Sequence, residues 1–470
     1  MITVDFENRT EGLCKSLCSK IRTMILSGEL KKGEKLPSKR ALSEHLGVSI
    51  ITVQNAYQNL ISEGFVYSIE RSGFFVSDSI PFYSKTPSKN QVEKAVHRFE
   101  KETDLFADFS SSSANAQKFP FSLWARLMRK VLSTNDEKLL RRTNAKGIAP
   151  LRAAIAHYLF DFRNLCVSSE QIVIGAGSES LISMLVSLLG REKLYVVENP
   201  GYKKIARLFE ANGASVKPVA IDDAGLCVEK LYDSNALVAH VSPEHHFPTG
   251  IKMPLRRRRE LLTWANEHHG FIIEDEFDSE FRFSGKPLPT LKAEDTEGRV
   301  IYINTFSKTI SPAFRVGYMV LPPELLLEFE RKLGFYSCQV PSFEQFTLFE
   351  FIAGGHFARH ISRMKNRYRS VRNALVRAIL ESDLKDIAKI REKESGLHFL
   401  LSLPKKCDCR EIRRRLFENA HIQIPLLSDF FFDDGTFLEK DDFVMNYSSI
   451  FPERIPEIVR RISAEVKNHV

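Results

Sequence analysis

From about Asp104 onward, short apolar runs alternate with longer segments that have the periodicity of helices. The apolar runs cover residues 171–174, 194–197, 237–241, 271–274 and 300–303. Runs of this kind, separated by helices, predict a mainly parallel sheet with helices on both faces. Ligands bind such sheets at the carboxyl ends of the strands, so the residues that follow each run are the candidates for a functional site.

The strongest chemical signal follows the last of these runs. Thr305, Phe306 and Ser307 precede Lys308, and Arg315 follows on a Ser-Pro turn. A lysine amine forms a Schiff base with an aldehyde, while hydroxyls and a guanidinium bind a phosphate. The pattern therefore predicts a site for an aldehyde cofactor that carries a phosphate. The alternative is that Lys308 is an ordinary surface lysine.

Three other strand ends carry weaker signals. Residues 175–180, Gly-Ala-Gly-Ser-Glu-Ser, join a strand to a helix, where free amides and the helix dipole suit a phosphate. Tyr202, after a Pro-Gly turn, offers a ring for stacking, and an acid within residues 274–278 offers a partner for a pyridine nitrogen. Ordinary turns and an acidic loop without a role remain alternatives.

The first 77 residues follow a different pattern. Apolar residues recur every four positions from Leu13 to Ile25, which predicts a helix that ends at Gly28. Ser38 and Ser49 are placed to cap two further helices, and two short apolar runs flank a Ser-Gly turn. Three helices and a hairpin form a winged helix-turn-helix, whose third helix enters the major groove of DNA.

Charge and composition support this division of the chain. The formal net charge is +8, and basic residues outnumber acidic ones between Leu13 and Val76. Residues 78–104 contain prolines, serines and lysines, which predicts a semi-flexible linker rather than a loop within one domain. The expected organisation is a winged helix over residues 1–77, a linker over 78–104 and an α/β domain over 105–470.

Other residue types exclude several classes of protein. The seven scattered cysteines contain no pair of C-x-x-C units, so we expect reduced thiols and no metal site. Neither a signal peptide nor a run of about 18 apolar residues is present, which favours a cytoplasmic protein without a membrane segment. The four arginines at 256–259 are expected on a solvated helix face.

The winged-helix segment resembles a known family. The run G-E-L-K-K-G-E-K-L-P-S-K-R-A-L-S-E-H-L-G-V-S is similar to the GntR class of bacterial regulators, over about residues 10–77. The resemblance implies DNA contacts from Ser38, Lys39, Arg40, Ser49, Thr52 and, at the tip of the wing, Gly73. Ile50 stands where the class usually has an arginine, which removes one cationic contact. A winged helix used only for protein contacts is the alternative.

The rest of the chain narrows this resemblance. The motifs P-G-Y, H-x-F-P-T-G, E-D-x-x-D-S-E-F-R and T-F-S-K-x-x-x-P-x-x-R-x-G-Y resemble the MocR subgroup, which joins a winged helix to a fold-type I aminotransferase domain. The resemblance implies that pyridoxal 5'-phosphate binds through a Schiff base with Lys308. It also implies pairing of Asp275 with the pyridine nitrogen, stacking of Tyr202, and a phosphate site of Ala176, Gly177, Ser178, Thr305, Ser307 and Arg315. A homodimer with swapped winged helices is implied as well.

Several positions of the second domain also depart from the family pattern. Phe277 and Phe247 replace a tyrosine and an asparagine that would bond the ring oxygen of the cofactor, which weakens its electronic tuning. Val444 stands at about the place of an arginine that grips the carboxylate of an amino acid. Glu179 places a carboxylate beside the expected phosphate, where it is unfavourable unless it points away, and Arg142 is a cation that could compensate for it.

The combination favours a DNA-binding transcription regulator that senses pyridoxal 5'-phosphate, or an adduct of it with an amine or amino acid. The aminotransferase-like fold would then serve sensing rather than catalysis, with residual half-transamination permitted. A working aminotransferase is the second interpretation, and Lys308, Asp275 and Tyr202 allow it. A domain that has lost its cofactor is the third, and the same lysine and aspartate oppose it.

Overall fold

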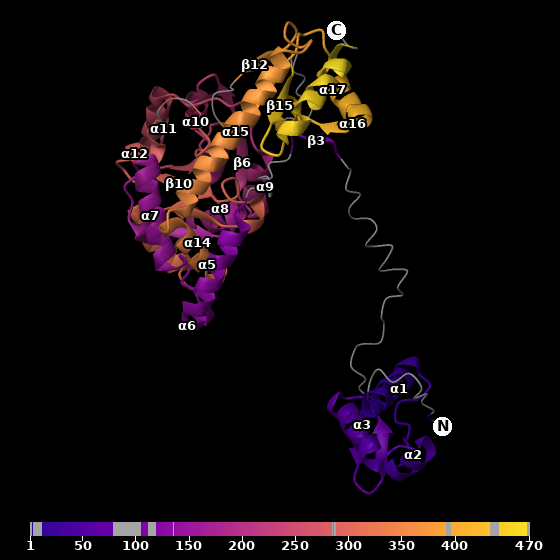
Figure 1. Ribbon diagram of the computed structural model, residues 1–470. Helices are drawn as coiled ribbons and strands as arrows, with labels where there is room; N and C mark the ends of the chain where they lie inside the picture. Colours follow the sequence, from indigo (N-terminus) through magenta and orange to yellow (C-terminus); the bar gives the residue numbers. More distant parts are fainter. Residues whose placement is uncertain are drawn as a thin grey trace. The chain divides into compact units, whose positions relative to one another are not determined.

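Figure 1 shows the computed structural model, which describes residues 2, 12–78, 105–110, 119–134, 136–283, 285, 288–391, 396–432 and 441–467. The chain divides into two compact units, Met1–Thr103 and Asp104–Val470. Apart from Asp78, the expected linker lies outside the described residues. Within the described ranges, no helix combines the length and apolar character that a membrane span requires.

The first unit is the predicted winged helix. Its elements are α1 (Leu13–Ser27), α2 (Lys39–Leu46), α3 (Ile50–Ser62), β1 (Val66–Ile69) and β2 (Gly73–Val76). Residues Leu17, Ile21 and Ile25 of α1 are buried as predicted, whereas Leu13, in the first turn, is exposed. Gly28 ends α1 in the left-handed conformation, at a φ of 82°. The wing is the antiparallel hairpin of β1 and β2.

The second unit is built on an eight-stranded sheet in the order β4-β11-β10-β9-β8-β5-β6-β7. Its strands are β4 (Ile172–Gly175), β5 (Leu194–Asn199), β6 (Ser215–Asp222), β7 (Gly225–Leu226), β8 (Val238–Val241), β9 (Phe271–Asp275), β10 (Val300–Thr305) and β11 (Gly317–Val320). The central pairs are parallel, as predicted, and β11 runs antiparallel between β10 and β4.

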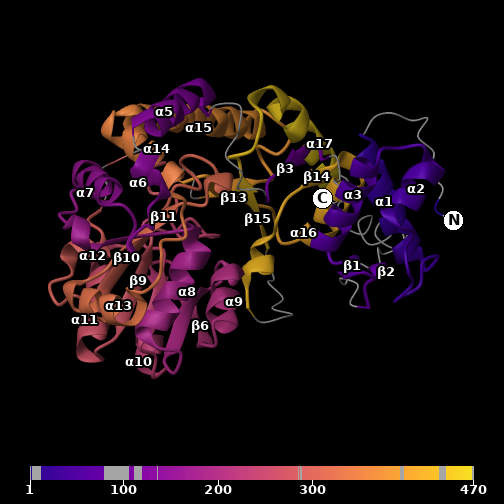
Figure 2. The same cartoon turned by 90° about the horizontal axis from the view of Figure 1, so that it is seen from below.

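Successive residues of the central strands enter cores on opposite faces of this sheet. Ile273 and Ile301 pack with α8 (Gly177–Leu189), α9 (Lys203–Ala211) and α13 (Pro323–Leu333). Ile272 and Val300 pack on the other side, with α10 (Val228–Tyr232) and α11 (Leu255–Glu267). The latter face continues over β4 and β11 with α5 (Phe121–Thr134), α7 (Ala149–Arg163) and α14 (Ser342–Ala353). Helices on both faces (Figure 2) match the fold expected from the apolar runs.

The C-terminal part of this unit adds a smaller sheet. A long helix, α15 (His356–Leu380), leads to the antiparallel strands β12 (Lys389–Arg391), β13 (His398–Ser402) and β15 (Asp442–Asn446). The remaining elements are α6 (Asp136–Leu140), α12 (Leu291–Glu294), α16 (Cys409–Ala420), α17 (Ile455–Lys467), and the two-stranded pair of β3 (Ala107–Asp108) and β14 (Ile422–Gln423).

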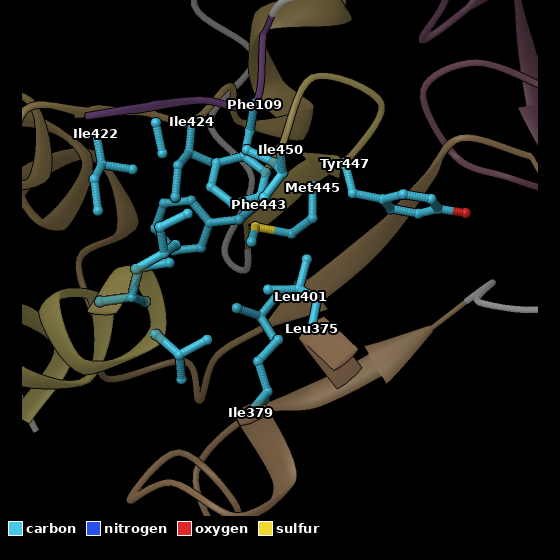
Figure 3. Close-up of a cluster of buried hydrophobic side chains, with 14 of the residues drawn as sticks. Phe109, Leu375, Ile379, Leu401, Ile422, Ile424, Phe443, Met445, Tyr447 and Ile450 are labelled. Atoms are coloured by element: carbon cyan, nitrogen blue, oxygen red, sulfur yellow. The ribbon is translucent and has the colours of Figure 1, made fainter. Parts of the chain in front are cut away.

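One face of the smaller sheet packs on a hydrophobic core, and the other face points away from that core. Leu401, Phe443 and Met445 pack against Leu375 and Ile379 of α15, as Figure 3 shows. Side chains of successive strand residues point to opposite faces. The residues between them on β13 and β15, including His398 and Val444, therefore lie on the opposite face.

Candidate functional site

Strand pairing brings three separate segments together at the carboxyl ends of β4 and β10 in the large sheet. Gly317, the first residue of β11, pairs with Thr305 at the end of β10 and with Gly175 at the end of β4. The residues that follow β4 and β10 therefore meet the residues that precede β11. Ala176, Gly177, Ser178, Thr305, Ser307 and Arg315, which were predicted around a phosphate, belong to these segments. We call this set the cradle.

Arg315 and the start of α8 lie in contact across the cradle. Arg315 follows the single-turn helix Pro312–Phe314 and adopts a left-handed conformation, with a φ of 45°. A Cβ atom on Gly177, whose φ is 79°, would lie 3.1 Å from Nη2 of Arg315. Glycine therefore allows the guanidinium to approach the backbone at the start of α8. A guanidinium beside the free amides of a helix N-terminus is suited to bind an anion.

Glu179 points into the cradle rather than away from it. Its Oε2 atom lies 2.9 Å from Nη2 of Arg315, and Nζ of Lys204 donates a hydrogen bond to Oε1. The bond from Lys204, with the nearby charge of Arg315, lowers the pKa of the Glu179 carboxyl. Arg142, expected to compensate for this carboxylate, donates instead to Ser337 Oγ at 2.6 Å and to the carbonyl of Phe335.

Lys308 lies just beyond the end of β10 and is partly buried. Burial lowers the pKa of its amine to about 8, although the nearby carboxylate of Asp278 acts in the opposite direction. The uncharged amine is therefore far more abundant near neutral pH than it is for an ordinary lysine, at roughly a tenth of the total at pH 7. The uncharged form is the one that attacks an aldehyde.

Asp275 closes the parallel strand next to β10. It pairs in register with Ile303, and its Oδ2 atom lies 3.3 Å from Nε2 of the buried His240 on β8. The ring of His240 therefore lies beside this carboxylate at the carboxyl ends of the strands. Tyr202 follows β5 at the same edge, precedes α9 and is 52% exposed. Its ring meets that of Phe247 edge-on, at 6.0 Å between centroids.

The acidic stretch around Asp275 has a structural role at almost every position. Glu274 accepts hydrogen bonds from the amides of Leu291 and Lys292, Glu276 pairs with Arg163 at 2.5 Å, Asp278 pairs with His245 at 3.1 Å, and Glu280 accepts from Tyr158 at 3.2 Å. These contacts give the neighbouring acids structural roles, and the pairing of Asp275 with a pyridine nitrogen stays a prediction. Arg163, buried behind the site, carried no sequence signal that separates it from surface arginines.

One expectation about the arginines of α11 is also wrong. Arg258 is fully buried, where it pairs with Glu244 at 3.3 Å and donates to the carbonyls of Met253, Pro243 and Pro289. Arg256 and Arg259 are more than half exposed, as expected for a solvated face. The helix turns each consecutive residue by about 100°, so one of four identical residues faces inward.

Phe247 and Val444, noted in the sequence, belong to an uncharged group of side chains that also includes His398, close to Lys308, and Phe430, which the sequence did not indicate. The Phe247 ring lies 5.1 Å from that of His398 and 5.0 Å from that of Phe430, and Val444 shares a face of the smaller sheet with His398. Burial holds the pKa of His398 well below its usual range, so its ring is neutral. We call Phe247, His398, Phe430 and Val444 the wall. Two of its residues, on β13 and β15, follow Phe247 by more than 150 positions.

The predicted DNA-contacting residues cluster on α2, α3 and the wing. Ser38 accepts from the amide of Ala41 at 3.2 Å, and Ser49 accepts from that of Thr52 at 3.1 Å, so both serines cap helices. Lys39 donates to Gln54 at 3.2 Å, which links the two helices. These side chains thus position the start of each helix.

Other residues near the predicted DNA contacts are exposed to solvent. Arg40 is exposed, and so are Ile50 at 44% and Ile51 at 70%, in the first turn of α3. Gly73 is the first residue of β2 rather than part of the turn, and its φ is 122°. A side chain there would lie 3.2 Å from Cε of Lys35.

Metal chemistry finds no support in the part of the chain that the structure covers. The described residues contain no group of three or more histidine, cysteine, aspartate or glutamate side chains that could hold a metal ion. All seven cysteines are free thiols.

Comparison with known proteins assigns both units to families. Residues 14–76 match the gntR family of bacterial regulatory proteins, and residues 112–438 match aminotransferase class I and II. The chain is 37% identical over 402 residues to YdeL of Bacillus subtilis, an uncharacterized HTH-type transcriptional regulator, with coverage of 85% of this chain and 86% of YdeL.

A second relative matches almost the entire chain. It is the probable rhizopine catabolism regulatory protein MocR of Rhizobium meliloti, 30% identical over 458 residues, which cover 94% of this chain and 91% of MocR. The fold also matches the crystal structure of an archaeal alanine:glyoxylate aminotransferase. That match has a TM-score of 0.70 at 25% identity and covers 81% of this chain and 95% of the aminotransferase.

Proposed function

This chain belongs to the MocR-type regulators of the gntR family, and from that premise we propose that its second unit binds pyridoxal 5'-phosphate to control DNA binding. The ligand is the cofactor itself or its adduct with an amine or amino acid. Because a ligand shifts a protein between two states only by binding them unequally, loading must favour one arrangement of the winged helices.

The observation that carries this proposal is the convergence of three groups at one sheet edge. The amine of Lys308 has a lowered pKa, the cradle holds a guanidinium, and Asp275 lies beside His240 at the end of the neighbouring strand. When bound, pyridoxal 5'-phosphate supplies an aldehyde and an electron-withdrawing ring. In that fit, Lys308 provides the nucleophile, Arg315 and the amides of α8 bind the phosphate, and Asp275 holds a proton at the pyridine nitrogen.

The wall favours sensing over catalysis. An amino acid substrate needs a cation for its carboxylate, and an arginine fork is the usual choice. Val444 is fully buried, and the neighbouring His398 is neutral. The site is therefore better suited to the cofactor alone, or to its adduct with an amine that has no carboxylate.

A working aminotransferase is the second candidate. The observation in its favour is that Asp275 closes β9, Lys308 follows β10 and Tyr202 follows β5, so all three lie at the carboxyl ends of parallel strands in one sheet. Half-transamination with a panel of amines and amino acids separates the two candidates. Sustained turnover would support the enzyme, and spectral change without turnover supports the sensor.

The proposed partners are double-stranded DNA in a bacterial cytoplasm and a second copy of the chain. Several large apolar side chains on the second unit are exposed, namely Leu140 at 84%, Phe335 at 68% and Phe121 at 65%. Covering these side chains against another protein would remove apolar area from water, which favours association. The exposed side chains therefore support a homodimer. We also propose that the two copies exchange their winged helices.

Direct measurement of DNA affinity tests the function. DNA selected from a random pool by the purified protein is labelled, and its binding is followed by fluorescence anisotropy as pyridoxal 5'-phosphate is added. We expect the dissociation constant to change about fivefold or more, and Lys308→Ala to abolish that change. Lys332→Ala, at a half-exposed lysine on α13 that pairs with Glu328, is the control. Equal DNA affinity with and without saturating cofactor would refute the proposal.

A further inference from the structure

The carboxylate of Glu179 occupies the position in which the cradle would bind an anion. It is the third residue of α8, and it bridges Arg315, at 2.9 Å, and Lys204. The guanidinium of Arg315 also lies against the backbone of Gly177, at the start of the same helix. The groups most suited to an incoming phosphate are therefore already in contact with a negative charge of the chain.

Stability does not account for this arrangement. The side chains of Glu179, Arg315 and Lys204 are 40%, 46% and 48% exposed. Ion pairs with this much exposure contribute little to folding, because water and salt screen them. Replacement of the carboxylate is therefore compatible with a folded protein, and its main effect falls on whatever anion binds at Arg315.

We propose that Glu179 is an internal competitor of the cofactor phosphate, which keeps binding weak enough for the protein to respond to the concentration of free pyridoxal 5'-phosphate. The inference rests on the proposed function and adds the residue that sets its sensitivity. Phosphate must displace the carboxylate from Arg315 or bind beside it, and the two anions repel each other. After allowance for solvent screening, the expected penalty is about tenfold in affinity.

The test compares two ligands that differ only in the phosphate. Full-length protein with Glu179→Gln, which keeps the shape and removes the charge, is titrated with pyridoxal 5'-phosphate and with pyridoxal, and absorbance reports binding. We expect the variant to bind the phosphorylated ligand about tenfold more tightly than the wild type does. Affinity for pyridoxal should stay within twofold.

A matched control exists at the other end of β4, where the strand begins. Glu170, just before β4, bridges Lys146 at 2.9 Å and Arg152 at 3.0 Å, and the pKa of its carboxyl is also lowered, chiefly by the hydrogen bond from Lys146. Glu170→Gln removes the same charge from a similar double ion pair that lies outside the cradle. Its affinity for both ligands should equal that of the wild type.

Inorganic phosphate provides a readout that does not depend on the cofactor. It should raise the melting temperature of Glu179→Gln more than that of the wild type or of Glu170→Gln. Unchanged or weaker cofactor binding by Glu179→Gln would overturn the inference, and so would equal tightening toward pyridoxal. Wild-type protein that takes up neither ligand would refute the proposed function, while the phosphate-dependent shift would still decide whether Glu179 guards an anion site.

Discussion

The cradle and the wall differ in how much of an aminotransferase site they retain. The cradle has a guanidinium, a glycine that admits it and the start of a helix, all suited to a phosphate. The wall has two phenylalanines, a neutral histidine and a buried valine, none of which offers a positive charge to a carboxylate. The difference indicates that this domain is suited to bind a cofactor, whereas its wall offers no cation for the carboxylate of an amino acid substrate.

This contrast explains how one fold serves regulation. Catalysis requires interactions that strengthen in the transition state, and the wall offers no cation for that purpose. Sensing requires only that one state of the protein binds the ligand more tightly than the other. Retention of the cradle and the lysine, together with loss of the carboxylate grip, satisfies the second requirement alone.

The largest effect should follow removal of the cradle cation. Arg315→Ala removes a charge-assisted contact to phosphate, and we expect affinity for pyridoxal 5'-phosphate to fall about thirtyfold, or about 2 kcal/mol. Affinity for pyridoxal, measured by the same absorbance titration, should change little. Equal losses for both ligands would show that Arg315 does not act at the phosphate and would remove the basis of the comparison.

Restoration of a polar group in the wall should have the next largest effect. Phe247→Asn offers an amide to the ring oxygen of the bound cofactor. We expect the pH midpoint of the visible absorbance change to fall by about one unit, a tenfold change in proton affinity. Phe247→Leu removes the ring without an amide and serves as the control. The same midpoint in both variants would place Phe247 away from the cofactor.

Cofactor uptake should depend on pH through the amine of Lys308. With a pKa of about 8, roughly a tenth of the amine is uncharged at pH 7 and half of it at pH 8. The rate of uptake, followed by stopped-flow absorbance, should therefore rise about fivefold between these values and level off above pH 9. A flat profile would show that proton loss from this amine does not limit uptake.

The smallest effect is expected in the first unit. It checks that a change at the predicted DNA contacts leaves cofactor binding by the second unit unchanged. Arg40→Ala should weaken DNA binding about threefold at every sequence, and should lower the salt dependence by about one ion, if the contact is to phosphate. Arg22→Ala, at an arginine that pairs with Glu63, is the control. A changed affinity of Arg40→Ala for pyridoxal 5'-phosphate would contradict this, because it would show that Arg40 influences the cofactor site.

The sequence predicted the winged helix and the mainly parallel sheet because local patterns specify both. Ser38 and Ser49 cap their helices, and each apolar run became a strand of the large sheet. The partners of buried charges were not predictable, since Arg163 and Glu276 are 113 positions apart and Arg258 resembles its exposed neighbours. The same holds for the direction of Glu179, which depends on contacts with Arg315 and Lys204 from other elements.

One experiment tests the central claim most directly. The purified protein is incubated with pyridoxal 5'-phosphate, reduced with borohydride, digested, and its peptides are mapped by mass spectrometry. The account predicts a single phosphopyridoxyl group on the peptide that contains Lys308, and none in Lys308→Ala. Modification of a different lysine, or of none, would contradict it.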